Sequence, residues 1–198
     1  RQVLYMIAHA VQQNDSRHIR TLAELNAVTY GDNMIADLNA GINITDTLEQ
    51  LLISTDGRID KFDTIADRMM ADYVRSIQVA PGGIVTDIYP AEGNEAGKID
   101  LIHDKYRGET VNYSIANDVL IIHGPFELEQ GGHVLSIRNP VFLQDEKGTP
   151  YFWGMTMVII KVPDIFQHSA DALTNFGYQY RLSKTISPCL LYTSDAAD

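Results

Sequence analysis

The sequence predicts an α+β fold, in which a long N-terminal stalk helix precedes an antiparallel sheet with flanking helices. The first observation is that apolar residues recur at intervals of three and four along residues 2–52. The second is a series of β-branched and aromatic runs at 84–89, 119–122, 133–138 and 152–161. Because short turns join the later runs, we expect antiparallel pairing, with the helices gathered on one side of the sheet.

The N-terminal helical pattern carries only a thin apolar stripe, which is typical of a helix that packs on one side. Gly31 and Gly41 are weak points in it, and the segment 43–45 is a candidate cap for a new helix at 46–52. A helix of about 40 residues is much longer than the average in globular proteins. It therefore predicts a stalk or dimerisation element, with a surface helix of a bundle as the alternative.

Helical spacing recurs in shorter segments farther along the chain. Apolar residues indicate helices over 59–74, 99–102 and 108–117. A further helix is expected to begin at Pro163 and to end before Gly177, since Pro suits the first turn and Gly the position after the last one.

The segment 90–97 is expected to be a loop, because it contains Pro and two glycines. Glu92 and Asn94 lie on it. The loop either wraps closely around a ligand or is a solvated acidic segment.

The central strands hold the most apolar residues of the sequence. The run 119–122 is too apolar to alternate, so we expect it to be buried on both faces. Pro140 permits only an edge, a bulge or the start of a new strand. Residues 146–148 predict a hairpin turn before the strand 152–161, and an alternating run at 178–182 is expected to close the sheet.

Composition narrows the function classes. The formal net charge of −11 disfavours nucleic-acid binding, which needs clustered Lys and Arg. The only cysteine is Cys189, so residues 1–188 have neither a disulfide framework nor a thiolate nucleophile. The glycine pairs lack the spacing of phosphate-binding loops, and no cofactor is expected.

The C-terminal ten residues, 189–198, resemble translated sequencing-adapter read-through and are not expected to belong to the fold. We expect a stalk region at 1–58, a core domain at 59–186 and a non-native tail at 187–198. No apolar run is long enough to cross a membrane, so any transmembrane helices are expected outside this fragment.

Catalytic and metal sites have little support. Ser114 and Ser136 have no neighbouring base at a spacing that predicts nucleophilic catalysis. Asp100, His103, Asp104 and His123 are a minor candidate for a metal site, but they lack His pairs at ligand spacing. We expect neither a catalytic residue nor a metal ion.

Two polar residues interrupt the apolar strands: His123 follows a buried run, and Arg138 ends another. A buried polar group without a partner is costly, so each needs one. Arg138 either pairs internally with Asp100 or Glu127, or faces a ligand cavity with aromatic walls. In the second case the candidate ligand-binding residues are Tyr89, Glu92, Asn94, Asp100, His123, Phe126, Arg138 and Trp153.

Four separated motifs resemble the CHASE domain, a family of extracytoplasmic sensory domains of histidine kinases, nucleotide cyclases and diguanylate cyclases. They are GIVTDIYPAEGNE at 83–95, GPFELEQGG at 124–132, RNPVF at 138–142 and FWG at 152–154. The resemblance runs in the right order over residues 59–182. It implies a PAS-like sheet after a long helix, flanking transmembrane helices, and a cytoplasmic output domain.

Plant cytokinin receptors belong to the same family, and their pocket carries Thr on the strand before Pro-Phe. Here that position is His123, so the resemblance implies the location of a pocket and not cytokinin recognition. The expected function is therefore a membrane-bound receptor domain facing the extracellular or periplasmic side. We expect it to bind an unknown small molecule and to dimerise through the stalk helix. A spacer without a ligand and a hydrolase are the alternatives.

Overall fold

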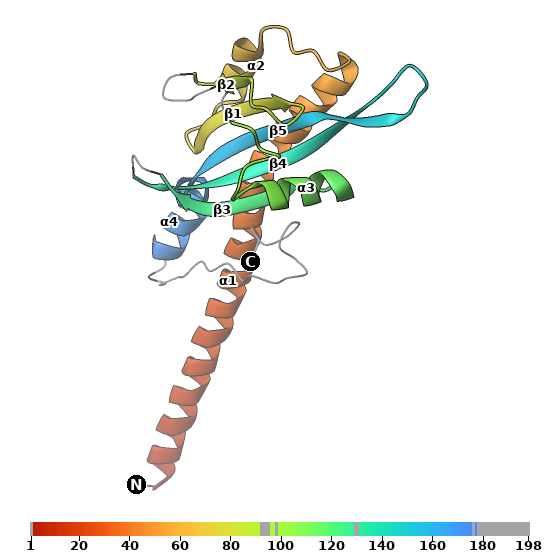
Figure 1. Ribbon diagram of the computed structural model, residues 1–198. Helices are drawn as coiled ribbons and strands as arrows, with labels where there is room; N and C mark the ends of the chain where they lie inside the picture. The colour runs from red at the N-terminus through yellow and green to blue at the C-terminus, as the bar shows by residue number, and fades with distance from the viewer. Residues whose placement is uncertain (1, 92–95, 98, 129–130, 176, 178–198) are drawn as a thin grey trace.

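A long helix and a five-stranded antiparallel sheet make up most of the computed structural model, which describes residues 2–91, 96–97, 99–128, 131–175 and 177. The strands lie in the order β2-β1-β5-β4-β3 (Figure 1). This arrangement confirms the expected α+β class. The elements are α1 (Gln2–Ser54), α2 (Phe62–Met69), β1 (Val74–Pro81), β2 (Asp87–Tyr89), α3 (Gly108–Asn117), β3 (Ile121–Glu127), β4 (His133–Gln144), β5 (Pro150–Val162), the 3₁₀ turn η1 (Asp164–Phe166) and α4 (Gln167–Asn175).

Helix α1 is continuous, so residues 43–45, a candidate cap in the sequence, do not begin a new helix. The Thr45 hydroxyl donates to the Ile42 carbonyl oxygen at 2.7 Å, within the helix, and therefore caps no new one. Leu48 and Leu52 are fully buried and anchor the C-terminal half of α1 against the sheet. The N-terminal half extends away from the sheet as a rod (Figure 1).

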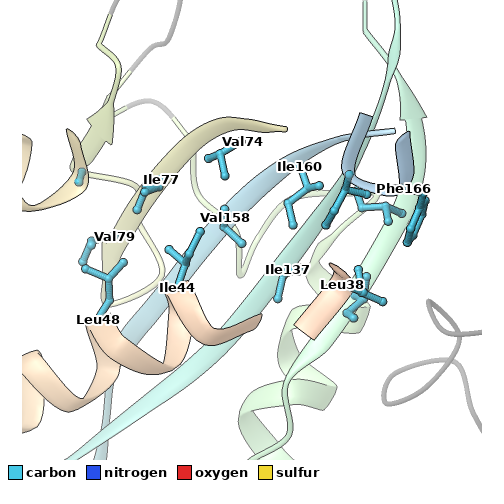
Figure 2. Close-up of a cluster of buried hydrophobic side chains, with 14 of the residues drawn as sticks. Leu38, Ile44, Leu48, Val74, Ile77, Val79, Ile137, Val158, Ile160 and Phe166 are labelled. Atoms are coloured by element: carbon cyan, nitrogen blue, oxygen red, sulfur yellow. The ribbon is translucent and has the colours of Figure 1, made fainter. Parts of the chain in front are cut away.

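One face of the sheet packs against α1 and holds the larger of two hydrophobic cores. Alternate residues of the central strands point to this face because side chains alternate along a strand. Figure 2 shows Leu38, Ile44 and Leu48 of α1 beside them. The strand residues in this core include Ile77, Val79, Leu135, Ile137, Val158 and Ile160, and Phe166 of η1 completes it.

The opposite face of the sheet carries a smaller core. Met155 and Met157 of β5 pack there with Val111 of α3 and with Leu101 from the segment between β2 and α3. This second core covers only part of the face, and the uncovered part is where the candidate site lies.

Several features differ from the sequence-based expectation. Helices lie on both faces of the sheet and not on one, because α1 packs on one face and α3 on the other. The strand expected over 84–89 spans only β2. The helix expected over 59–74 spans only α2, and Val74 already begins β1, a strand that the helical spacing concealed. The expected helix at 99–102 is absent from this described stretch. Its backbone instead forms an antiparallel bridge from Asp100 to Ile84.

Other expectations were confirmed. Helix α3 has the predicted bounds, and the predicted turn at 146–148 joins β4 to β5. Pro140 lies in β4 at a point beyond the last residue paired with β3, so β4 has a free edge there. The expected strand at 178–182 and the tail at 187–198 lie outside the described residues.

No helix in the described part of the chain combines the length and the apolar composition needed to cross a membrane.

At Gly41, α1 lies in tight contact with the sheet. A Cβ atom at this position would overlap Ile160 Cδ1 and lie 3.1 Å from Ile137 Cδ1. Gly31, ten residues earlier on the same helix, has no atom within 4 Å of its Cβ position. Gly41 is therefore needed for packing, whereas Gly31 only weakens the helix.

These two glycines predict opposite effects of the same substitution. Gly41→Ala should destabilise the domain by about 1–3 kcal/mol because the new methyl overpacks the core. Gly31→Ala should stabilise α1 by about 0.5–1 kcal/mol through helix propensity. Urea unfolding followed by circular dichroism measures both, and equal effects at the two positions would contradict this reading.

Candidate functional site

A cavity of about 490 Å³ lies on the face of the sheet opposite α1. The sheet forms its floor, and Ile99, Leu101 and Arg107, from the segment between β2 and α3, form part of its wall. The volume lies within the range of small-molecule sites. Six floor residues come from three strands: Ser76, Gln78, Ser136, Arg138, Met157 and Ile159.

Strand alternation places these side chains together. In the β4–β5 register, Ser136 lies opposite Ile159 and Arg138 lies opposite Met157. The residues between them, such as Ile137 and Val158, point to α1 instead. The floor is thus two cross-strand rows, with polar groups on β4 and apolar groups on β5.

A bulge in β1 adds a charged residue to the cavity. Arg75 and Ser76 both line it, although consecutive residues of a regular strand point to opposite faces. The β1–β5 register shifts between Val74 and Ser76, so the irregularity lies at Arg75. Such a bulge redirects a side chain.

Arg138 is the central polar residue of the cavity, and only 3% of its surface is exposed. Its Nη1 lies 3.4 Å from Nδ1 of His123. It forms no ion pair with Asp100 or Glu127, the two internal partners considered from the sequence, both of which the structure describes. Burial, followed by the positive charge of Arg107, lowers the pKa of Arg138 to about 10, so it remains a cation at neutral pH.

Two buried polar atoms in the cavity lack a hydrogen-bond partner among the described residues: Arg138 Nε and Ser136 Oγ. Native proteins rarely leave such groups unsatisfied, and exceptions call for an explanation. Ser76 and Gln78 differ, because Gln78 Nε2 donates to Ser76 Oγ at 2.9 Å. The unsatisfied groups therefore lie together on β4.

Three residues predicted from the sequence meet at this place. The ring of His123 contacts that of Phe126 edge to face, with centroids 4.7 Å apart, and His123 also approaches Arg138. Phe126 and Arg138 line the cavity directly. The β-bulge between His123 and Phe126 positions the end of β3 over the cavity.

The structure does not bring the other candidates to the cavity. Tyr89 and Trp153 pack on the α1 side of the sheet, and the Tyr89 hydroxyl donates to Asp67. The Asp100 carboxylate lies beside the cavity wall but accepts from His103, which lowers the pKa of Asp100. Glu92 and Asn94 lie outside the described residues.

The sequence reading missed several lining residues because it missed β1. Arg75, Ser76 and Gln78 interleave with Val74, Ile77 and Val79, which is the pattern of a strand with a polar side. That pattern was the available signal. Arg107 had no comparable signal, since its place in the wall depends on how residues 99–107 fold over the sheet.

The minor metal hypothesis finds no geometric support in the described part of the chain. No group of three or more His, Cys, Asp or Glu side chains gathers there in an arrangement that could hold an ion. His103 and Asp100 form an exposed pair, and Asp104 pairs with Arg107 instead.

Comparison with known proteins gives one informative finding. No protein-family model and no curated protein matches the chain. Among solved structures, the fold is similar to that of an extracellular ligand binding receptor from Desulfohalobium retbaense DSM5692, with a TM-score of 0.54 and 16% identity. The match covers 72% of this chain and 25% of that receptor, so the chain spans about a quarter of the receptor's length. At this identity the likeness shows a shared fold.

The buried, incompletely satisfied guanidinium predicts an unusual stability effect. Without added ligand, Arg138→Met should leave the free energy of unfolding unchanged or raise it, because replacing a buried charge by an apolar side chain removes a desolvation cost. Urea unfolding at neutral pH measures it. The cross-strand neighbour provides the comparison: Met157→Ala should cost about 2–5 kcal/mol. A loss of about 3 kcal/mol or more for Arg138→Met would instead identify a structural ion pair.

Proposed function

We propose that this chain is an extracytoplasmic ligand-sensing domain of CHASE type, a receptor module and not an enzyme. The observation that carries the proposal is the cavity on the sheet, with Ser136 Oγ and Arg138 Nε buried and unsatisfied among the described residues. A ligand that bonds to these groups offsets their desolvation cost. The fold shared with an extracellular ligand binding receptor supports the same class of function.

The contacts between the sheet and α1 support a sensing role. Asn139 directly follows Arg138, points to the opposite face and donates from Nδ2 to Glu49 Oε2 at 2.8 Å. The cross-strand partner of Asn139 is Thr156, whose hydroxyl donates to the Thr45 carbonyl oxygen of α1 at 3.1 Å. A ligand that displaces β4 or β5 therefore acts on residues adjacent to the α1 contacts.

Such a ligand changes the position of α1 only if it binds two arrangements of α1 with different affinity. In this proposal α1 is the output element. It connects to a transmembrane helix outside this fragment, and the domain lies on the extracellular or periplasmic side of the plasma membrane. A cytoplasmic diguanylate cyclase or histidine kinase then reads the change, as the resemblance to CHASE domains implies.

A thermal-shift screen of the domain against a library of small metabolites tests ligand binding. At least one compound should raise the melting temperature, and Ser136→Leu, which fills the cavity, should abolish that rise. Trp153→Phe is the matched control, because Trp153 lies on the α1 side of the sheet and its substitution should leave the rise intact. A screen without any stabilising compound, or a rise that survives Ser136→Leu, would remove the cavity as the binding site.

We also propose that the domain forms a homodimer through α1. Leu25 and Val28 are 64% and 65% exposed, and Leu22 and Ile35 are also exposed on this helix. Leu25, Val28 and Ile35 follow one another at intervals of three and seven, which is the spacing of a coiled-coil seam. The same feature would also serve a spacer that binds no ligand, the alternative function considered from the sequence.

The dimer proposal predicts a concentration-dependent mass by size-exclusion chromatography with light scattering. The double variant Leu25→Glu and Val28→Glu should be monomeric, because it places charges in the seam. Arg20→Gln, an exposed substitution outside the seam, should behave like the parent chain. A parent chain that is monomeric at every concentration, or a double variant that still dimerises, contradicts the proposal.

A further inference from the structure

We propose that the cavity binds a small organic acid, whose carboxylate is held by Arg138 and Ser136 while its apolar body lies against Met157 and Ile159. This inference rests on the proposed ligand-sensing function and adds the chemical class of the ligand.

The charge of the cavity is opposite to that of the protein. Among the described residues that line it are three arginines, Arg75, Arg107 and Arg138, and one carboxylate, Glu127. Arg107 is partly compensated by Asp104, with Nη1 3.4 Å from Oδ2. The whole chain carries a formal net charge of −11, so this concentration of guanidinium groups is not a property of the general surface. A site of this sign selects an anion.

The unsatisfied atoms indicate how the anion binds. Arg138 presents a planar fork of N–H donors, which matches the two oxygens of a carboxylate. Ser136 lies two residues earlier on β4 and therefore on the same face, and its hydroxyl is also without a described partner. One carboxylate group accepts hydrogen bonds from both side chains, which satisfies the buried donors of β4.

The apolar half of the cavity defines the rest of the ligand. Met157 lies directly across from Arg138, and Ile159 lies across from Ser136. Leu101 and Ile99 add further apolar surface from the wall. An inorganic anion would leave this apolar surface uncovered. A carboxylate attached to an aliphatic or aromatic body contacts both the polar groups of β4 and the apolar side chains.

Isothermal titration calorimetry with matched acid and amide pairs tests the inference. The probes are a series of small aliphatic and aromatic acids, including hexanoate and phenylacetate, each beside its neutral amide, together with inorganic phosphate. At least one acid should bind about 10-fold or more tightly than its amide, because the amide loses the charge-assisted bonds to Arg138. Phosphate should bind more weakly than that acid.

Variants assign the effect to Arg138. Arg138→Met should weaken binding of the acid by about 10-fold or more, and Arg138→Lys should fall between it and the parent, since Lys keeps the charge but not the fork. Arg68→Gln, at an exposed arginine of α2, should leave the affinity unchanged. The unfolding curve of each variant confirms that it is folded.

Three results would overturn the inference: an amide that binds as tightly as its acid, an acid whose affinity is unchanged in Arg138→Met, or no binding by any acid at millimolar concentration. If neutral metabolites bind and Ser136→Leu blocks them, the ligand-sensing function stands and only the carboxylate class fails. If no compound of either kind binds, both fail. If phosphate binds as tightly as the best acid, the apolar residues Met157 and Ile159 do not contribute to ligand binding, and that part of the inference fails.

Discussion

The packing of α1 across one face of the sheet is the interaction on which the rest of the structure depends. It buries Leu48 and Leu52 completely and gathers the inward residues of three strands into the main core. Successive side chains of a strand point to opposite faces of the sheet. Because the apolar residues of β1 and β4 face α1, the polar residues between them face the other side. A short helix and a connecting segment cover that face only in part, and the cavity occupies the remainder.

The sequence predicts the fold correctly in segments where the apolar residues follow a single periodicity, either that of a helix or that of a strand. Helix α3 and the β4–β5 hairpin have strong local signals, namely helical spacing and a Gly-containing turn. Strand β1 was concealed because Tyr73 and Val74 continue the helical spacing of the preceding segment. The continuity of α1 depends on tertiary burial of its C-terminal half, which overrides the local capping signal of Thr45.

The site could be predicted from residues that violate the apolar pattern of their own strand. Arg138 and His123 stood out for that reason: Arg138 lines the cavity, and His123 contacts Arg138. Tyr89 and Trp153 were chosen for aromatic character, which does not say to which face of a sheet a side chain points. Arg107 reaches the cavity through a connecting segment whose path depends on contacts with the sheet, so local sequence could not place it.

The close approach at Gly41 has a mechanical consequence for α1. Moving the helix along or around its axis by one residue would bring the side chain of Ala40 or Ile42 to a point where even a methyl overlaps Ile160. The contact between Gly41 and Ile160 therefore holds α1 in one register against the sheet. Residues 2–40 lie on the N-terminal side of this contact, so a small change in the tilt of α1 at Gly41 displaces the far end of the helix by a large distance.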